Sequence, residues 1–311
     1  MKDKLVTLVG GGGFLGRYIA QDLFAAGARV RIVQRDPRQA WFLKTQGGLG
    51  QTQFAAADVT RPDTIMRALH GSDMVVNLAG TFGLGMAAVQ ADGARAVAVA
   101  ATATGATALV HISAIGADPE GTSRYAQSKG KGEAAVRAAF PAATILRPST
   151  VFGREDQFVN RFAAVIAILP AVPVLRAGAK FQPVFVADVA AAAVAALARP
   201  EMAAGRTFEL GGPDTLSMGA LIRWIARVIG RDPAILELPD PVGSLISLGG
   251  FLPGAPITRD QWKMLQHDSV ITPGAGTLAT LGVTPTPLDA VAPTWLIRYR
   301  RHGRFGAGVA A

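Results

Sequence analysis

The sequence of 311 residues contains no cysteine, which excludes both a disulfide framework and a thiolate metal site. Its four histidines, His70, His111, His267 and His302, are scattered without the paired spacing of metal ligands, so we expect no bound metal. Aromatic residues make up only 7% and do not interleave with a basic stripe, which argues against nucleic-acid binding. Charged residues are also sparse, at 17%, so long disordered segments are expected only at the ends.

The sequence also lacks an uncharged hydrophobic run long enough to predict a membrane span. The first expected strand starts at residue 5, which leaves no room for a leader peptide and favours a cytosol-like compartment. Hydrophobic residues make up 50%, enough for one large core and a smaller appended one. The net charge of +9 favours an anionic partner: a nucleotide, an acidic protein or an anionic lipid.

Apolar runs typical of buried parallel strands alternate with helical patterns through the first half of the chain. The expected strands cover residues 5–9, 28–34, 53–57, 73–78, 108–113 and 143–146. The expected helices cover residues 14–26, 38–45, 62–69, 86–104 and 125–139. This order predicts an α/β fold with a doubly wound parallel sheet, a Rossmann domain over residues 1–150 whose core elements continue to about residue 232.

The second half predicts a smaller C-terminal α/β lobe over residues 151–297, interleaved with the core. Its expected helices cover residues 156–169, 187–198 and 218–229, and its expected strands cover residues 181–186 and 207–210. From about residue 233 onward, proline and glycine predict irregular structure. Residues 241–257 carry no charge and are open to three interpretations: a cleft lining, a core loop, or a docking site for an apolar protein or bilayer surface. Residues 298–311 are expected to form a basic tail.

A glycine-rich turn joins the first expected strand to the first expected helix. Gly10, Gly13 and Gly16 are spaced G-x-x-G-x-x-G. Such glycines allow a tight turn, the approach of a phosphate and close packing of the helix on the strand. The free N–H groups at the helix start, including those of Phe14 and Leu15, then face a pyrophosphate. The motif therefore predicts a dinucleotide-binding site.

The end of the second strand bears on the choice of cofactor. NAD-specific sites place a carboxylate there, whereas this chain has Gln34 followed by Arg35, with Arg38 nearby. Because guanidinium groups attract a 2′-phosphate, we expect NADP(H), bound through Arg35 with help from Arg38. The alternative is that both are ordinary surface arginines and that Asp36 turns inward.

Further candidate residues follow the third and fourth strands. Asp58 and Val59 stand where an adenine edge would be contacted, although Asp58 is equally expected to cap the following helix. Asn77, Ala79 and Gly80 end the fourth strand with mostly small residues, which would let the cofactor pass.

Tyr125 and Lys129 lie four residues apart and so share one face of a helix. A nearby ammonium group lowers the pKa of a phenol, which can then exchange a proton with a substrate oxygen. Ser113, at the end of the preceding strand, is placed to hydrogen-bond the same oxygen. These three residues are the candidate catalytic group, and a surface helix pair is the alternative interpretation.

Together these motifs, with residues 146–148, resemble the short-chain dehydrogenase/reductase superfamily in its extended, epimerase/dehydratase-like branch. The resemblance covers about residues 4–212 and includes residues 182–190 as the strand-to-helix segment of the second domain. It implies that Pro148, Thr150 and Val151 lie against the nicotinamide.

A closer resemblance extends over the whole chain and is carried by residues 10–17, 34–37, 111–118, 125–133 and 256–262. These segments are similar to the NADPH-binding accessory subunits of respiratory complex I, in their alphaproteobacterial form. The resemblance implies a mainly structural nucleotide and partner subunits where the peripheral arm meets the membrane. It also implies a peripheral position on the cytoplasmic side of the inner membrane, where the basic tail would suit anionic lipid.

Two other functions remain open from the sequence. The chain could be a soluble NADP(H)-dependent reductase or epimerase that uses Ser113, Tyr125 and Lys129, since none of these looks chemically disabled. A redox-sensing regulator is a third reading, but no DNA-binding element supports it. No motif identifies a substrate.

Overall fold

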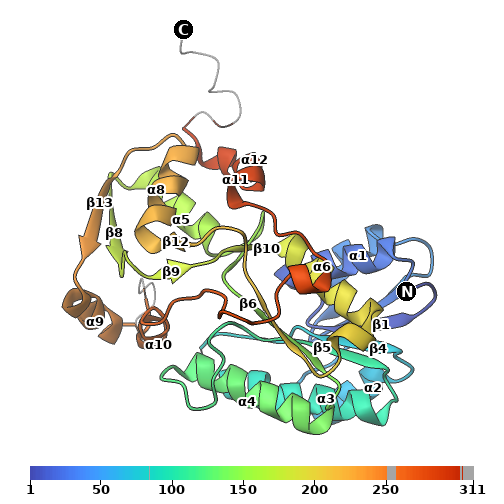
Figure 1. The fold of residues 1–311 in the computed structure, drawn as a ribbon. Coiled ribbons are helices and arrows are strands. Elements are labelled where there is room, and N and C mark those ends of the chain that lie inside the picture. Colours follow the sequence, from blue (N-terminus) through green and yellow to red (C-terminus); the bar gives the residue numbers. More distant parts are fainter. Residues whose placement is uncertain (84, 251–256, 302, 304–311) are drawn as a thin grey trace. The chain divides into compact units, whose positions relative to one another are not determined.

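The computed structural model describes residues 1–83, 85–250, 257–301 and 303 (Figure 1). Its contacts divide the chain into two compact units. Unit 1 comprises residues 1–148, 186–210 and 271–284, and unit 2 comprises residues 149–185, 211–270 and 285–311. The chain therefore leaves unit 1 and returns to it twice.

Seven parallel strands form the sheet of unit 1, in the order β11-β6-β5-β4-β1-β2-β3. Their bounds are β1 Leu5–Val9, β2 Arg29–Gln34, β3 Thr52–Ala56, β4 Met74–Asn77, β5 Ala108–Ile112, β6 Thr144–Pro148 and β11 Thr207–Leu210. The order reverses at β1, because the chain passes from β3 to the other side of β1 to form β4. Such a switch point opens a ligand crevice at the carboxyl ends of the strands. The predicted Rossmann sheet is confirmed.

Helices cover both faces of this sheet, as Figure 1 shows. The helices α1 and α6 pack together on one face, and α2, α3 and α4 lie on the other. Their bounds are α1 Phe14–Ala25, α2 Pro62–Leu69, α3 Gly93–Ala103, α4 Arg124–Ala139 and α6 Val186–Ala198, with the short α7 Pro200–Ala203 and 3₁₀ turn η3 Ala279–Leu281 beside them. The buried alanines of α3 keep its side chains short where it packs against α2 and α4.

Two expected helices of unit 1 take other forms. The segment after β2 is a 3₁₀ helix, η1 Pro37–Thr45. The single helix expected over residues 86–104 begins as a π-helix, η2 Ala88–Asp92, and continues as α3. A π-bulge inserts an extra residue into a helix and so changes the direction in which a side chain points. Here it accompanies the burial of Gln90.

Unit 2 combines three two-stranded sheets with short helices. The strand pairs are β7 Val151–Phe152 with β10 Val184–Phe185, β8 Ala171–Leu175 with β13 Ala234–Leu238, and β9 Lys180–Phe181 with β12 Leu216–Ser217. The helices are α5 Val159–Ile168, α8 Met218–Val228, α9 Asp240–Leu248, α10 Arg259–Met264, α11 Leu288–Val291, α12 Pro293–Leu296 and η4 Ile297–Tyr299.

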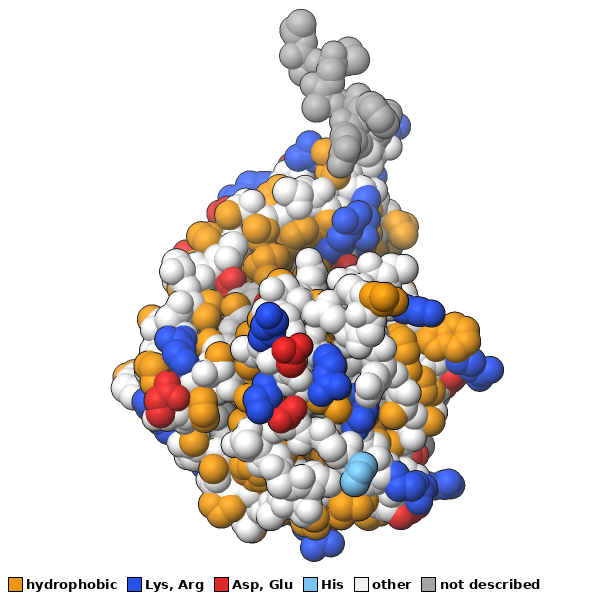
Figure 2. All heavy atoms as spheres, turned by 90° about the vertical axis from the view of Figure 1, so that its right-hand side faces the viewer, with side chains coloured by type: hydrophobic (Ala, Val, Ile, Leu, Met, Phe, Trp, Pro, Cys, Tyr) orange, Lys and Arg blue, Asp and Glu red, His pale blue; other side chains and the backbone are white. Residues whose placement is uncertain are grey.

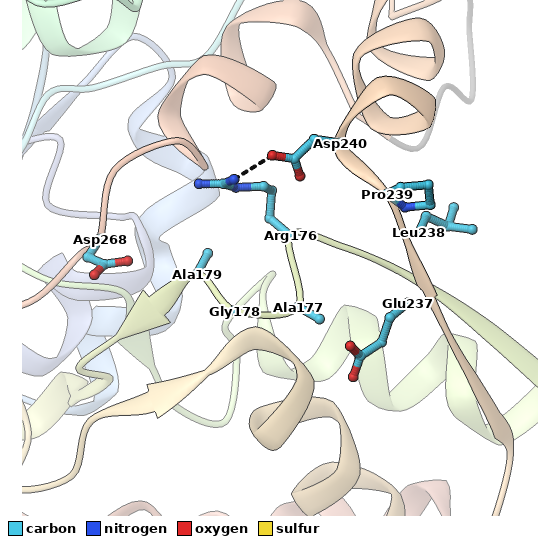
Figure 3. Close-up of a pocket in the computed structure, with 9 residues that line it drawn as sticks. All are labelled: Arg176, Ala177, Gly178, Ala179, Glu237, Leu238, Pro239, Asp240 and Asp268. Atoms are coloured by element: carbon cyan, nitrogen blue, oxygen red, sulfur yellow. Dashed lines mark hydrogen bonds and ion pairs between the residues drawn. The ribbon is translucent and has the colours of Figure 1, made fainter.

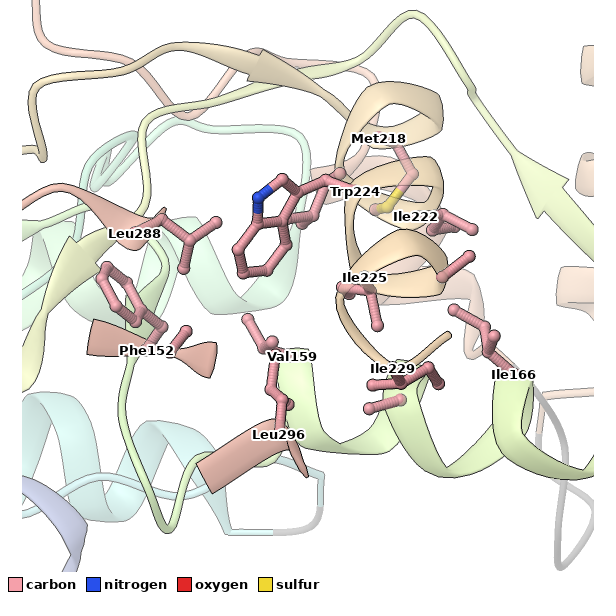
Figure 4. Packing of buried hydrophobic residues seen from close by; sticks show 14 of the residues in the cluster. Phe152, Val159, Ile166, Met218, Ile222, Trp224, Ile225, Ile229, Leu288 and Leu296 are labelled. Carbon is pink, nitrogen blue, oxygen red and sulfur yellow. The ribbon is translucent and has the colours of Figure 1, made fainter. Parts of the chain in front are cut away.

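The core of unit 2 forms around the apolar face of α8 (Figure 4). Trp224 and Ile225 from this helix pack with Phe152, Val159 and Leu296, which come from three other elements. The indole Nε1 of Trp224 donates a hydrogen bond to Asp289, which satisfies its polar atom. Since unit 2 has no large sheet, this aromatic core supplies much of its apolar burial.

The irregular structure expected from residue 233 onward is wrong for several segments, including two consecutive ones. Residues 234–238 form the strand β13, and residues 240–248 form the helix α9. Pro241 lies in the first turn of α9, where a missing N–H costs nothing. Gly243 lies under the ring of Trp262, which would stand 2.5 Å from a Cβ there. Residues 251–256 of the predicted docking segment lie outside the described residues.

Two other details differ from the expectations for the second half. The strand expected over residues 181–186 is split into β9 and β10 at Pro183, which cannot donate to a ladder. The expected basic tail begins as packed structure: Arg298 donates to Asn160 Oδ1 at 2.8 Å, and Arg300 donates to the carbonyl of Val228 at 3.0 Å. The residues after 303 are not described.

Basic and acidic side chains are intermixed on the face shown in Figure 2, with hydrophobic patches between them. The basic side chains on this face are therefore spread out instead of gathered into a stripe. Within the residues that the structure describes, no helix combines the length and the hydropathy needed to cross a membrane.

Candidate functional site

The glycine turn lies between β1 and α1, at the switch point of the sheet. Gly10 has a φ of +84°, and a Cβ there would lie 3.2 Å from the backbone N of Ala79. A Cβ on Gly16 would lie 2.3 Å from the carbonyl oxygen of Gly11, so α1 packs too closely for a side chain. Gly13 differs, because a Cβ would meet only an ordinary contact at 3.4 Å. The fold does not require glycine at Gly13, whereas a phosphate at the start of α1 would.

The start of α1 suits an anion. Gly13 is the N-cap and offers no side chain to the first-turn N–H groups, which include those of Phe14 and Leu15. The first turn contains no acidic residue. The positive end of the helix dipole is therefore open to a phosphate, and these residues fit a bound dinucleotide.

The segment after β2 holds its own carboxylate in place. The guanidinium of Arg38 binds Asp36 through two hydrogen bonds, with Nε 2.8 Å from Oδ1 and Nη2 3.1 Å from Oδ2. The amide Nε2 of Gln34 donates to the carbonyl of Asp36 at 2.7 Å, and its Oε1 lies over Gly12. Of the two predicted arginines, Arg38 thus pairs within the turn. Arg35 is exposed beside it.

Asp58 and Val59 both make structural contacts after β3. The carboxylate of Asp58 accepts hydrogen bonds from the backbone N of Thr60 at 2.9 Å and from its hydroxyl at 2.8 Å. These bonds hold the pKa of Asp58 below its usual value, with smaller help from nearby arginines. Val59 packs against Gly93, where a Cβ would lie 2.8 Å from it. Asp58 therefore stabilises a turn, and the adenine contact stays a prediction.

Asn77 joins the ends of β4 and β5. Its Oδ1 accepts from the backbone N of Ala79 at 3.1 Å, so its Nδ2 faces Nδ1 of His111 at 3.1 Å. Burial, with the charge of Lys129, lowers the pKa of His111 to about 3, so the imidazole is neutral. Nδ1 then accepts and Nε2 carries the hydrogen. In the described part of the chain, this buried Nε2 has no hydrogen-bond partner.

The helix α4 brings Lys129 to the carboxyl end of β5. Ser123 caps this helix by accepting from the backbone N of Ala126 at 3.0 Å. One turn after Tyr125, Nζ of Lys129 donates to the carbonyl of Ile112 at 3.1 Å. Ser113 follows directly, and its buried hydroxyl has no hydrogen-bond partner among the described residues. Gly80, three residues after β4, lies beside Lys129, whose Nζ would stand 3.7 Å from a Cβ on that glycine.

The phenol ring of Tyr125 is stacked on Phe82, with centroids 4.9 Å apart and planes 10° apart. Burial raises the pKa of Tyr125 to about 12. Burial also lowers the pKa of Lys129 to about 8, although the charge of Glu133 opposes this shift. The expectation that Lys129 lowers the pKa of Tyr125 is therefore wrong for this structure. Desolvation of the phenol sets the direction of this shift.

Replacing Lys129 by methionine should change how stability depends on pH. Above about pH 8 the folded wild type releases the Lys129 proton, whereas the unfolded chain holds it until about pH 10.5. Stability must then rise with pH, by about 2 kcal/mol between pH 8 and pH 10 relative to Lys129→Met. Denaturant unfolding at both pH values measures this difference. The control is Lys131→Met, on the exposed side of α4; parallel pH curves for wild type and Lys129→Met would refute the prediction.

The residues predicted to lie against the nicotinamide fall in both units. Pro148 is the last residue of β6 in unit 1. Thr150 and Val151 belong to unit 2, where the Thr150 carbonyl accepts from the backbone N of Val184 and Val151 pairs with the same residue. Their contact with a nucleotide stays a prediction.

Sequence reasoning missed Gln90, which ties α4 to the end of β4. Its Oε1 accepts from the hydroxyl of Ser128 at 2.7 Å, and its Nε2 donates to the carbonyl of Thr81 at 2.5 Å. A single glutamine in an alanine-rich helix was the available signal. Through its bond to Thr81, Gln90 supports the segment that carries Gly80 and Phe82.

A buried ion pair was also missed. Glu133, one turn after Lys129, binds Arg147 on β6 through two hydrogen bonds of 2.8 and 2.7 Å. Glu209 on β11 lies 3.7 Å from the same guanidinium. Both glutamates are buried. No local sequence pattern pairs residues this far apart in the chain.

Unit 2 holds a separate pocket of about 540 Å³ (Figure 3). Arg176 projects into it and binds Asp240, with Nη1 2.6 Å from Oδ2. Glu237 and Asp268 line other walls, so carboxylates outnumber cations. Across the described residues, no group of three or more histidine, aspartate and glutamate side chains is placed to hold a metal ion.

Comparison with known proteins gives three kinds of match. A model of the NAD dependent epimerase/dehydratase family matches residues 6–211. The mitochondrial NADH dehydrogenase [ubiquinone] 1 alpha subcomplex subunit 9 of Mus musculus is 35% identical over 309 residues, which cover 96% of this chain and 81% of that protein. A ceramide reductase of Caulobacter vibrioides is 31% identical over 261 residues, which cover 81% of this chain and 80% of that protein. The structure of Citrobacter sp. triphenylmethane reductase complexed with NADP(H) matches with a TM-score of 0.76 and 19% identity. The match covers 94% of this chain and 99% of that one.

Proposed function

Because the chain belongs to the NAD-dependent epimerase/dehydratase family, we propose that it binds NADP(H) as an accessory subunit of respiratory complex I, with the nucleotide in a mainly structural role. The observation that carries nucleotide binding is Gly13, which the fold leaves open at the start of α1. Homology to the alpha subcomplex 9 subunits over most of the chain supports the assignment to complex I.

The preference for NADP(H) rests on the end of β2. Asp36 is neutralised by Arg38, so no free carboxylate repels a 2′-phosphate there. Arg35 is exposed on the same segment and supplies a guanidinium for the phosphate. The charge of Arg35 also lowers the pKa of Asp58, two residues after β3, which supports a position of Arg35 at this edge of the sheet.

A structural role for the nucleotide is supported by the protonation states around Tyr125. Acid–base catalysis works best when the pKa of the catalytic group lies near the working pH. Burial instead holds the phenol of Tyr125 at a pKa of about 12, and Phe82 covers one face of its ring. Bound nicotinamide would supply hydride chemistry, and a phenol with this pKa stays protonated at neutral pH, so it is not prepared to act as a base.

Charge reversal at Arg35 should separate the two cofactors. In Arg35→Glu the affinity for NADPH should fall by about 10- to 100-fold, since a charge-assisted hydrogen bond contributes about 1.5–3 kcal/mol. The affinity for NADH should change little. Titration of the nucleotide fluorescence measures both constants. Arg61→Glu, the same charge change at an exposed neighbour of Asp58, is the control, and equal affinity of the wild type for NADPH and NADH would contradict the assignment.

The assignment to complex I is tested on the native complex. We expect purified complex I to contain this chain with NADP(H) bound and to leave that nucleotide unoxidised when NADH is turned over. The partners would be subunits near the junction of the peripheral arm and the membrane, on the cytoplasmic side of the bacterial inner membrane. Absence of the chain from the complex, or steady oxidation of its nucleotide, would overturn this proposal.

A second candidate function is a soluble NADP(H)-dependent reductase or epimerase. Two observations favour it: Lys129 reaches the carbonyl of Ile112 at the end of β5, directly before Ser113, and one relative is named a ceramide reductase. In this case Tyr125 would exchange a proton with the substrate oxygen. Turnover of a carbonyl substrate that is lost in Tyr125→Phe would favour the enzyme over the structural subunit.

A further inference from the structure

A bridge of hydrogen bonds joins α4 to the segment after β4, with the side chain of Gln90 at its centre. Gln90 is 1% exposed and lies in the π-helix η2. Its Oε1 accepts from the hydroxyl of Ser128 at 2.7 Å, and its Nε2 donates to the carbonyl of Thr81 at 2.5 Å. Both ends of this buried amide are therefore bonded, as a buried polar group requires.

The bridge has a rigid base. A Cβ on Gly132 of α4 would lie 2.1 Å from the backbone oxygen of Gln90, so α4 and η2 pack at backbone distance. At the end of η2, a Cβ on Gly93 would lie 2.8 Å from the side chain of Val59. Single-turn π-bulges inside α-helices are frequent at functional sites. Here the π-bulge places a glutamine, held by close packing, where it bonds the segment after β4.

That segment carries Phe82, which follows Thr81 directly. The Phe82 ring is stacked on the phenol ring of Tyr125, with planes only 10° apart. Phe82 is 67% exposed, whereas Tyr125 is mostly buried, so Phe82 is the outer ring of the pair. A ring that remains largely in water gains little from its own burial. Its contact instead removes one face of the phenol from solvent.

The other end of the bridge starts on the turn of α4 that carries the same phenol. The hydroxyl of Ser128 lies within hydrogen-bond distance of both Gln90 Oε1, at 2.7 Å, and the backbone oxygen of Tyr125, at 2.9 Å. The contacts therefore form a closed circuit within unit 1, which passes through Tyr125, Ser128, Gln90, Thr81 and Phe82.

We propose that Gln90 is a positioning residue that holds Phe82 as a cover over the phenol of Tyr125 and so shields it from a carbonyl substrate. This inference rests on the proposed structural role of the nucleotide, and it adds the contact that keeps the candidate catalytic group closed. The covering segment also meets the glycine turn, because a Cβ on Gly10 would lie 3.2 Å from the backbone N of Ala79. The cover and the proposed nucleotide site thus share one stretch of chain.

The test measures nitration of Tyr125 by tetranitromethane, which attacks the ionised phenol, with the modified peptide identified by mass spectrometry. In Phe82→Ala the nitration rate should rise about 10-fold, since access of water that lowers the pKa of the phenol by about one unit raises its ionised fraction by that factor. Phe82→Trp should keep the slow rate, because it retains a ring. Phe42→Ala, the same truncation at another partly exposed ring, should have no effect, and Tyr18 is the internal reference.

Gln90→Leu tests the bridge itself. It removes both hydrogen bonds and keeps a side chain of similar size. Nitration of Tyr125 should rise in this variant too, by a smaller factor than in Phe82→Ala, because the covering ring is released but still present. The titratable neighbours on α4 and β5, Lys129 and His111, stay unchanged in every variant, so a faster reaction does not come from a lost charge.

Thermal unfolding and NADPH titration of each variant exclude a general folding defect. Equal nitration of Tyr125 in wild type and Phe82→Ala would refute the cover. A faster reaction in Phe82→Ala but not in Gln90→Leu would refute the positioning role of Gln90. Failure of the wild type to bind NADPH would overturn the proposed function, and the nitration rates would still decide whether the phenol is covered.

Discussion

Replacing Arg147 by methionine is expected to lower the free energy of unfolding by about 3–5 kcal/mol. The substitution keeps most of the side-chain volume but leaves two buried glutamates, Glu133 and Glu209, without their cation. An uncompensated buried charge is costly because its desolvation is no longer offset by attraction. Unfolding in urea, followed by far-UV circular dichroism, measures the loss.

A matched control isolates burial from charge. Arg67 pairs with Asp63 at 3.0 Å on the exposed face of α2, and Arg67→Met should cost about 0.5 kcal/mol or less. The double variant Arg147→Met with Glu133→Gln should recover part of the loss, since one buried charge is removed. A loss for Arg147→Met no larger than for Arg67→Met would show that the pair contributes no more than a surface salt bridge.

Alanine at Gly16 should abolish detectable nucleotide binding. Its Cβ would stand 2.3 Å from the backbone oxygen of Gly11, and neither group can move without breaking the contact of α1 with the turn. We expect the NADPH affinity to fall by more than about 100-fold and the protein to lose stability as well, as overpacking costs about 1–3 kcal/mol. Isothermal titration and thermal unfolding of the nucleotide-free protein measure the two effects.

Gly13 provides the informative comparison. A methyl group there makes only an ordinary 3.4 Å contact, so Gly13→Ala should keep the stability of the nucleotide-free protein. It should still weaken NADPH binding by about 10-fold or more, because the methyl group occupies the approach of the phosphate. Equal nucleotide affinity of Gly13→Ala and wild type would place the pyrophosphate elsewhere.

The proposed structural role of the nucleotide would account for two sets of features that otherwise conflict. The turn and the start of α1 lie at the switch point of the sheet, and with the arginine after β2 they are suited to a nucleotide. The residues suited to catalysis are present, but burial moves the pKa values of Tyr125 and Lys129 toward their neutral forms. A ligand that binds only the folded state stabilises it by mass action, with no turnover required.

The main sheet was predictable because its information is local. Buried parallel strands appear as short apolar runs, and the glycine turn needs its strand before it and its helix after it. The aromatic core of unit 2 and the helix α9 were less predictable. Pro241 and Gly243 indicate irregular structure in sequence, yet one occupies a helix start and the other makes room for Trp262. Only the packing partner distinguishes the two meanings.

The sequence by itself determined the fold class, the glycine turn and the helix that carries Tyr125 and Lys129, because each depends on residues near one another in the chain. Tertiary structure alone decided how those residues are charged and paired. The pKa of Tyr125 depends on its burial, with Phe82 stacked on its ring. Arg38 is paired because the turn places Asp36 beside it, and the charge of Glu133 is compensated by Arg147 from a strand far along the chain. Desolvation and ion pairing act through space, so no spacing along the chain reports them.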